Sequence, residues 1–403
     1  MKFRKSLFLG IAASMVLSSC NSISNFVPAN PVTLFPNFSS YNANLKNLSV
    51  EIQWNQKFDL SQLEDEGFDL YGLNKNNKTI RARISNSQMS VLQTKGITFK
   101  NIRESSMAEG SGLLPGYRTY QQMKDYLFSL QNQYPDLVTV KDVGDTWQKV
   151  YQNAKNNDIW MVAITNKKSK MQNKPASLFV AGLHARELAP VEVILKFAEE
   201  LVTKYGKDEY ITSLLDTREV HLLPMDNVDG RIMVEKGNTW QRENANGVDL
   251  NRNYDCKYLP NFPPKDYRGT DNPQKQEPET IAIQDLYKTT KYNLYMDIHA
   301  YGEMFFWPVG YSEKDIPEAA SFKRVYANTF KKIGYDGGTS AQILYSTVAT
   351  SDDYAYIKQH SFGLGMEVGR SFRPSYSEVE KMWAAIKPNF LYLVKISDAP
   401  FSQ

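Results

Sequence analysis

Cysteine and histidine are scarce in this 403-residue chain, which contains only two cysteines and four histidines. No block of basic residues is present, and the net charge at pH 7 is only +3. Because nucleic-acid binding needs a basic patch, these features exclude it as a main function. The apolar stretch at residues 7–17 is too short to cross a membrane as a helix. At 403 residues and 42% apolar composition, the chain is still long enough to bury a large core.

Residues 1–19 have the pattern of a signal peptide, with basic residues at the start followed by the short apolar stretch. The sequence Leu17-Ser-Ser-Cys20 resembles a bacterial lipobox, which implies cleavage before Cys20 and attachment of lipid to its sulfur. An ordinary secretory signal with an incidental cysteine is the alternative. We therefore expect an exported protein that is lipid-anchored to the bacterial cell envelope, at the outer membrane or cell surface, and that proteolysis could release.

If Cys20 carries a lipid, the other cysteine, Cys256, has no intrachain disulfide partner. A cysteine nucleophile needs a neighbouring base, and the loop around Cys256 offers no histidine. We therefore expect Cys256 to be a buried thiol rather than a nucleophile.

The chain divides into a small N-terminal part and a large C-terminal part. Residues 20–46 are rich in Asn, Ser and Pro and predict a tether. Residues 47–103 show the patterns of strand, helix, strand, helix and strand, which predict a small α+β domain. Residues 104–116 contain three glycines and predict a linker.

The large part, residues 117–403, alternates between strand and helix patterns. Strands are expected at residues 138–143, 159–165, 176–183, 219–224, 294–298 and 363–368. Helices are expected at residues 120–134, 189–205, 278–290 and 319–332. Strands interleaved with helices imply an α/β fold with a mixed, mostly parallel central sheet and helices on both faces.

His184 and Glu187 stand between the strand at 176–183 and the helix at 189–205, where an α/β fold places its chemistry. Both residue types are good zinc ligands, although this spacing also occurs by chance in surface loops. His299 follows another strand-like run. Two histidines and one glutamate at strand ends leave a fourth zinc position for water, which is the arrangement of a catalytic site.

With these residues in place, the chain resembles the zinc metallocarboxypeptidases of the carboxypeptidase A/B family across residues 117–403. The blocks that carry the resemblance, in the family's order, are His184-Ala-Arg-Glu187, Asp226-Asn-Val-Asp-Gly230, Arg242-Glu-Asn244, Gly247-Val-Asp-Leu-Asn-Arg-Asn-Tyr254, His299-Ala-Tyr301, Tyr345 and Glu367. The resemblance implies a monomeric exopeptidase that uses one Zn²⁺ to remove C-terminal residues from peptides or proteins. Residues 147–157 depart from the family pattern.

The resemblance also assigns roles to residues outside the zinc ligands. Glu367 follows Tyr345 by 22 residues and matches the general base and acid, a salt-bridged glutamate being the alternative. Arg242 matches the arginine that stabilises the oxyanion. Asn251 and Arg252 match the clamp for the substrate's α-carboxylate, and Tyr345 matches a mobile lid tyrosine.

Three further residues are expected around this centre. Arg186 and Tyr301 match residues in the region that contacts the upstream part of the substrate. Asp249 is expected to accept a hydrogen bond from His184, because a metal-bound histidine usually donates its other N–H to a carboxylate or carbonyl. Asp249 would then orient the histidine without binding the metal.

Specificity depends on Asp352, seven residues after Tyr345. This position matches the B-type branch, where an aspartate selects C-terminal Lys or Arg. A buried carboxylate is costly unless it is paired, so a cationic side chain is its natural ligand. The alternative is that Asp352 pairs with a neighbouring donor and leaves a mixed pocket, which Phe306 and Thr347 would also line.

Several alternatives stay open. The small domain is similar in position to the family's pro-domain, which covers the cleft until proteolysis, but it could equally be a spacer. A peptidoglycan amidase that cuts next to diaminopimelate and a non-catalytic binding protein are the rival functions. The intact Asn251-Arg252 clamp and Tyr345 favour a carboxypeptidase over the amidase, and the presence of Glu367 argues against a binding protein.

Overall fold

The computed structural model describes residues 48–54, 60–104, 107, 112–256 and 276–403. By its contacts the chain divides into two compact units, and all described residues belong to the second, Asn42–Gln403. The predicted signal peptide, Cys20 and tether lie outside the described residues, as does part of the linker. Within the described ranges, no helix has the length and apolar character needed to cross a membrane.

The small domain is a four-stranded antiparallel sheet with two helices. Its elements are β1 Leu48–Gln53, α1 Leu60–Asp65, β2 Asp69–Asn74, β3 Thr79–Ile84, α2 Asn86–Thr94 and β4 Phe99–Asn101, with the strand order β2-β3-β1-β4. The predicted elements are all present, but the prediction of three strands was wrong because it missed β2. This strand contains Gly72 and an irregular register against β3, so it shows no clear alternation.

The large domain is built on an eight-stranded sheet with the order β11-β10-β12-β9-β7-β8-β6-β5. The strands are β5 Val138–Asp145, β6 Asp158–Ile164, β7 Ala176–Ala181, β8 Glu219–Leu223, β9 Tyr292–His299, β10 Met304–Phe306, β11 Asp336–Gly338 and β12 Phe362–Glu367. The four central strands, β12, β9, β7 and β8, are parallel, and antiparallel pairs flank them. This arrangement confirms the predicted mixed, mostly parallel sheet.

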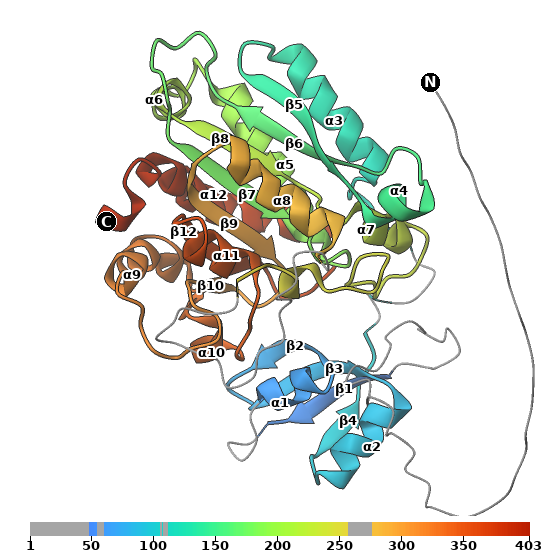
Figure 1. Ribbon diagram of the computed structural model, residues 1–403. Coiled ribbons are helices and arrows are strands. Elements are labelled where there is room, and N and C mark those ends of the chain that lie inside the picture. The colour runs from blue at the N-terminus through green and yellow to red at the C-terminus, as the bar shows by residue number, and fades with distance from the viewer. Residues whose placement is uncertain (1–47, 55–59, 105–106, 108–111, 257–275) are drawn as a thin grey trace, which may run out of the picture. The chain divides into compact units, whose positions relative to one another are not determined.

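Helices cover both faces of this sheet, as predicted (Figure 1). One face packs against α3 Tyr120–Gln133, α5 Leu188–Lys204 and α12 Tyr376–Ile396, and the other against α8 Pro278–Thr289 and α11 Ser351–Ile357. The remaining helices are α4 Trp147–Gln152, α6 Glu209–Thr217, α7 Val228–Glu235, α9 Ala319–Asn328 and α10 Ser340–Ile343, with short 3-10 turns at η2 Leu250–Arg252, η4 Phe330–Ile333 and η5 Pro400–Ser402. The predicted single helix at 319–332 was wrong, because Thr329 adopts a non-helical backbone conformation between α9 and η4.

The connection from β7 to α5 is the local structure on which the site depends. Every residue of β7 is buried, which fits its mostly apolar sequence in the middle of the sheet. Gly182 follows with φ +73°, and a Cβ atom there would lie 3.0 Å from the Cα of Met225. This turn is therefore suited to glycine, and it places His184 and Glu187 between the end of β7 and the start of α5.

Candidate active site

The predicted catalytic residues meet where three parallel strands end. In the sheet, β9 lies between β7 and β12, and all three run in the same direction. His299 is the last residue of β9, and its register partner on β12 is Glu367. Ala181, the last residue of β7, pairs with Ile298, so the turn that carries His184 and Glu187 starts beside the end of β9.

Two imidazoles converge on the carboxylate of Glu187. His184 Nδ1 lies 2.8 Å from Glu187 Oε1, and His299 Nδ1 lies 3.0 Å from Glu187 Oε2. All three residues are buried, and one ligand atom from each lies within 4.8 Å of the other two. Two nitrogens and one carboxylate with room for a fourth ligand fit Zn²⁺ in a catalytic site. The three predicted metal ligands therefore form one cluster.

A second acidic group, Asp142, Asp145 and Asp158, also brings three carboxylates within 4.8 Å. The ammonium of Lys149 pairs with two of these carboxylates, Asp145 and Asp158. This group is also partly exposed, so its charge is already compensated by the protein and by solvent. The buried His184, Glu187 and His299 cluster is therefore the better match for a resident metal ion.

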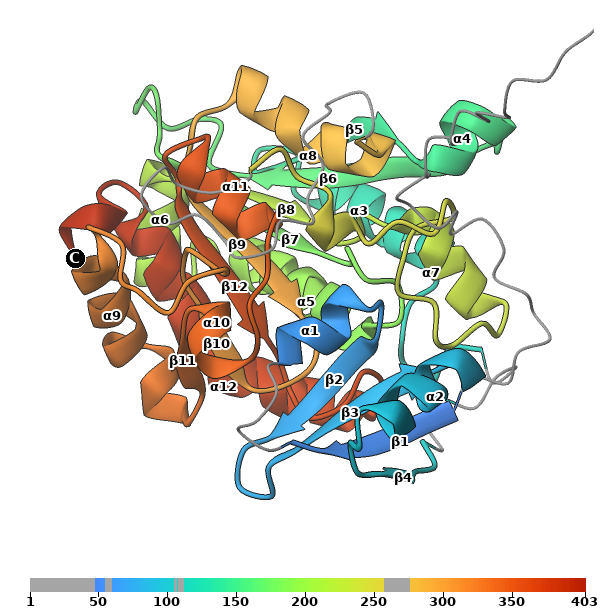
Figure 2. The same cartoon turned by 60° about the horizontal axis from the view of Figure 1, so that its bottom comes forward.

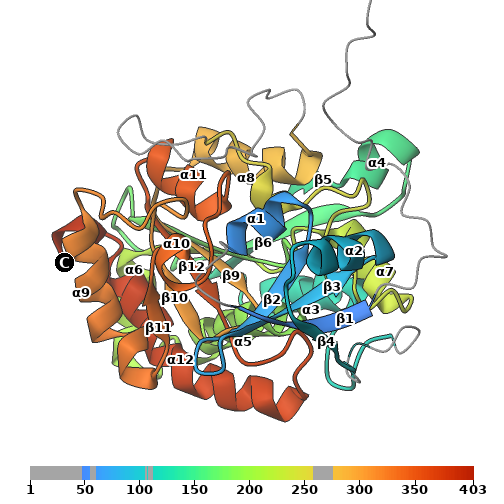
Figure 3. The same cartoon turned by 90° about the horizontal axis from the view of Figure 1, so that it is seen from below.

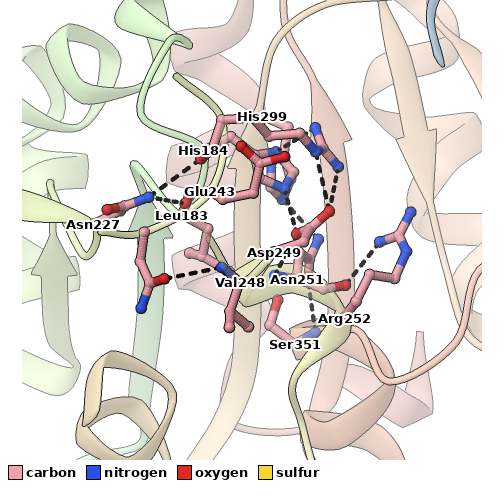
Figure 4. Close-up of polar contacts among 12 residues, drawn as sticks. Leu183, His184, Asn227, Glu243, Val248, Asp249, Asn251, Arg252, His299 and Ser351 are labelled. Carbon is pink, nitrogen blue, oxygen red and sulfur yellow. Dashed lines mark hydrogen bonds and ion pairs between the residues drawn. The ribbon is translucent and has the colours of Figure 1, made fainter. Parts of the chain in front are cut away.

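Carboxylates lie against the outer nitrogens of both imidazoles, and Figure 4 shows the one beside His184, which is Asp249. His184 Nε2 lies 3.0 Å from Asp249 Oδ1, the contact that the sequence predicted. His299 Nε2 lies 2.8 Å from Asp297 Oδ2, which also accepts a hydrogen bond from Ser351 Oγ. The sequence analysis missed Asp297, although its position two residues before His299 on a strand places both side chains on the same face.

Arg242 is anchored beside the metal cluster. Its Nε donates to Asp249 Oδ2 over 3.0 Å, so Asp249 joins Arg242 to His184. Arg242 Nη1 lies 3.1 Å from His184 Nδ1 and 3.8 Å from Glu187 Oε1. This geometry puts a positive charge beside the His184, Glu187 and His299 cluster.

Glu367 is mostly buried at the end of β12. It lines a pocket that His184, Glu187 and His299 also line. Burial, and secondarily the nearby Glu187 carboxylate, raises the pKa of Glu367 to about 8. A cation held by His184, Glu187 and His299 would lower this pKa again. A carboxylate with these neighbours is suited to accept and return a proton near neutral pH.

Nearly all the predicted site residues line one pocket. These are His184, Arg186, Glu187, Arg242, Asn251, Arg252, His299, Tyr301, Tyr345, Asp352 and Glu367; Asp249 lies behind them. Asp297, Phe306 and Thr347 line the same pocket. Asp352 comes from the first turn of α11 and is buried, and burial raises the pKa of its carboxyl group despite a hydrogen bond from Thr350.

Two carboxylates of the small domain, Glu64 on α1 and Asp69 on β2, pair with arginines that line this pocket. Figure 2 and Figure 3 show α1 and β2 against the large domain. Glu64 Oε1 accepts hydrogen bonds from Arg252 Nε and Nη2 over 3.0 and 2.7 Å. Asp69 pairs with both terminal nitrogens of Arg186, with 2.6 Å between Asp69 Oδ1 and Arg186 Nη2. Both contacts occupy arginines that the sequence assigned to substrate binding, and neither carboxylate had been predicted to take part.

Apolar contacts also join the small domain to the residues of the pocket. Leu70, Tyr71 and Gly72 of β2 line the pocket. The Tyr71 ring lies 6.4 Å from Tyr301 and 5.2 Å from Phe372, measured between ring centroids. Tyr345 packs against the core of the small domain.

The predicted buried thiol of Cys256 is confirmed, and it lies in the core on the α8 and α11 face.

Comparison with known proteins identifies relatives of this arrangement. The family model described as zinc carboxypeptidase matches residues 123–387. Carboxypeptidase B from Canis lupus familiaris is 26% identical over 259 residues, which cover 60% of this chain and 60% of that protein. Carboxypeptidase B from Homo sapiens is 30% identical over 204 residues, which cover 46% of this chain and 49% of that protein. The chain thus spans less than two thirds of these relatives.

One solved structure, carboxypeptidase A from Helicoverpa armigera, has a TM-score of 0.69 and 17% identity, covering 89% of this chain and 98% of the other. At this identity the likeness establishes the fold alone. It shows that the described fold is that of a carboxypeptidase.

We predict that Asp297→Asn weakens zinc binding by about 10- to 100-fold, because the amide orients His299 less well than a carboxylate does. Competition with a chromogenic zinc chelator measures this affinity directly. Asp353→Asn is the matched control, since Asp353 is also buried but accepts from the backbone N–H of Gly310. Equal zinc affinities for the native protein and both variants would contradict the assigned role of Asp297.

Proposed function

The chain belongs to the zinc carboxypeptidase family, and from this premise we propose that it is a metallocarboxypeptidase that removes the C-terminal residue of peptides and proteins. One observation carries the proposal. The arginine of the carboxylate clamp, Arg252, lines the same pocket as the His184, Glu187 and His299 cluster and the mostly buried Glu367. A clamp, a metal centre and a proton carrier are the parts that such an exopeptidase needs.

His184, Glu187 and His299 would hold the zinc ion. When bound, zinc supplies a Lewis acid that polarises the scissile carbonyl and acidifies a water molecule. Glu367 accepts a proton from the attacking water and returns it to the nitrogen of the leaving amine. Arg242, fixed by Asp249, pairs with the negative charge that develops on the carbonyl oxygen.

Arg252 explains why the enzyme would act only at chain ends. Its guanidinium presents a planar set of N–H donors that pairs with a free carboxylate. An internal peptide residue has no charge to offer there and would leave Arg252 without a counter-ion. Glu64 supports this role, because a carboxylate of the same chain already binds to Arg252.

We propose a preference for C-terminal Lys or Arg. Asp352 lies in the pocket and its carboxylate is buried, so a cationic substrate side chain would compensate a charge that is otherwise costly. Asp297 adds a second carboxylate to the pocket lining, which further favours a cation.

We also propose that residues 47–103 act as an inhibitory pro-domain. Glu64 and Asp69 occupy Arg252 and Arg186, and Tyr71 and Gly72 lie in the pocket mouth. Burial opposes the charge on Asp69, but the paired Arg186 overrides it and holds the pKa of Asp69 below its usual 3.8. The ion pair is therefore kept above that pH and lost only as the pH falls below it.

The sequence of the N-terminal region supports an exported protein that is attached to the cell envelope through lipid on Cys20, and the family resemblance supports a monomer. Its partners would then be peptide or protein C-termini at that surface. Cleavage between the two domains would release the large domain and open the site.

We predict that the zinc-loaded protein, opened by Glu64→Gln and Asp69→Asn, cleaves a blocked dipeptide ending in Arg faster than one ending in Phe. Asp352→Asn should lower kcat/KM for the Arg substrate by about thirtyfold or more, because losing one partner of a buried charge pair costs about 2–5 kcal/mol. Asp353→Asn is the control and should keep the preference, and Glu367→Gln should remove activity. Faster cleavage of the Phe substrate would rule out the basic preference.

The inhibitory role generates a separate prediction. Glu64→Gln with Asp69→Asn should raise kcat/KM of the full chain at least about tenfold, since each removes a charge-assisted contact of about 1.5–3 kcal/mol. The ratio of this variant's kcat/KM to that of the native chain should stay the same from pH 5 to 9, because the pKa of Asp69 lies below this range. Lys75→Met, which removes only the exposed Lys75–Asp336 ion pair between the domains, is the control and should change little. A native chain as active as the double variant would instead favour a spacer domain.

A further inference from the structure

The carboxylate of Asp226 is buried in the segment that follows β8, and none of its surface is exposed to solvent. Among the residues that the structure describes, none forms a hydrogen bond with either of its carboxylate oxygens. The backbone holds Asp226 in place, because its N–H donates to the carbonyl of Ala181 over 3.2 Å and its carbonyl accepts from Val228 N over 3.0 Å. A buried carboxylate in this state is costly unless something compensates its charge.

The charged groups around Asp226 do not compensate it. Its electrostatic neighbours are Glu279 of α8 and Asp297 of β9, and both are acidic. Glu279 is fully buried and accepts hydrogen bonds from Trp147 N and Asn244 Nδ2. In the described part of the chain, no lysine or arginine forms an ion pair with Asp226, Glu279 or Asp297. This region of the core therefore has a surplus of negative charge.

Protonation would not satisfy Asp226 either. Burial, together with the charges of Glu279 and Asp297, raises the pKa of Asp226 well above its usual 3.8. A protonated carboxyl group gains an O–H donor, which needs an acceptor, and its other oxygen still needs a donor. Neither oxygen has such a partner within the described ranges. A bound species that contacts these oxygens would remove the cost in either case.

A second oxygen beside Asp226 is in the same situation. The hydroxyl of Tyr254 is fully buried and has no hydrogen-bond partner in the ranges that the structure covers. Its nearest charges are the carboxylates of Asp226 and Asp297. Tyr254 belongs to the core beneath α8 and α11, on the face of the sheet that α8 covers in Figure 1. Carboxylate and hydroxyl oxygens, without nitrogen or sulfur donors, are ligands that hard cations prefer.

We propose that Asp226 is the carboxylate ligand of a hard cation, bound in the core with the hydroxyl of Tyr254 beside it and separate from the zinc cluster. The cation would compensate the charge of Asp226 and give both unpaired oxygens a partner. Because Asp226 is bonded to the end of β7 and Asp297 lies on β9, the cation would also hold these strand ends together. Its role is structural.

Two kinds of cation share this chemistry. Ca²⁺ takes carboxylate, carbonyl and water oxygens, and Na⁺ or K⁺ takes the same oxygens with a lower charge. The ligand atoms of Asp226, Glu279 and Asp297 do not form a group within 4.8 Å among the described residues. Asp226 would therefore bind the ion directly, and the other two carboxylates would act through their charge. Zinc would prefer the two imidazoles of the other cluster.

The test measures thermal unfolding of the full zinc-loaded chain by calorimetry, after dialysis into a tetramethylammonium buffer. KCl, NaCl or CaCl₂ is then added, with tetramethylammonium chloride at equal ionic strength as the reference. The ion that binds should raise the unfolding midpoint by at least about 3 °C, because a ligand of the native state stabilises it by mass action. Comparison of the three salts identifies which cation the site takes.

Asp226→Asn should remove this shift, because a neutral amide does not compensate a cation. Asp142→Asn is the matched control, since it removes a carboxylate from the partly exposed Asp142, Asp145 and Asp158 group, and it should keep the shift. A native chain without any ion-specific shift would overturn the site. A shift that survives Asp226→Asn, or that Asp142→Asn removes, would overturn it as well.

Tyr254→Phe gives a second readout if Asp226→Asn does not fold, and it should reduce the shift at a given ion concentration. Anomalous diffraction from crystals soaked in Rb⁺ or Tb³⁺, which replace K⁺ and Ca²⁺, should show a peak beside the Asp226 carboxylate. A peak only at the Asp142 group, or no peak, would count against the site. None of these results bears on the proposed function, which does not use Asp226.

Discussion

The site depends on the parallel pairing of β7, β9 and β12, which brings three chain segments to one edge of the sheet. This pairing places a carboxylate, Glu187, between two imidazoles, one from the turn after β7 and one from the end of β9. Burial alone would raise the pKa of Glu187, and the histidines override it and lower the pKa. Such a buried group of donors is suited to a cation.

The charged residues around this cluster have separate roles. Asp249 and Asp297 hold the outer nitrogens of the two histidines, so that Nδ1 of each faces Glu187. Arg242 takes its position from the same Asp249. The arginines further out, Arg186 and Arg252, pair with carboxylates of the small domain, so the groups that would bind substrate are also the groups that bind this domain. If the small domain inhibits, as we propose, inhibition and substrate recognition would use the same two arginines.

Much of this arrangement could be predicted from the sequence, for identifiable physical reasons. With only four histidines in the chain, two of them at strand ends, His184 and His299 were strong candidates once Glu187 was considered. The layered fold followed from the alternation of strand and helix patterns. Asp297 could also have been predicted, because the two-residue period of a strand puts it on the same face as His299.

The contacts of the small domain could not be predicted in this way. Glu64 on α1 and Asp69 on β2 look like ordinary surface carboxylates until the two domains dock, and β2 itself lacks a clear alternation. The break at Thr329 is similarly invisible in a sequence whose apolar spacing continues from α9 into η4. Tertiary packing decides which distant segments contact each other, and a local sequence pattern does not show it.

The most direct test of this account is anomalous X-ray diffraction at the zinc edge from crystals of the zinc-loaded protein. The account predicts one strong peak at the cluster, about 2.0–2.2 Å from His184 Nδ1, His299 Nδ1 and a Glu187 oxygen. A peak at another position, such as the Asp142, Asp145 and Asp158 group, with none at the cluster, would contradict it.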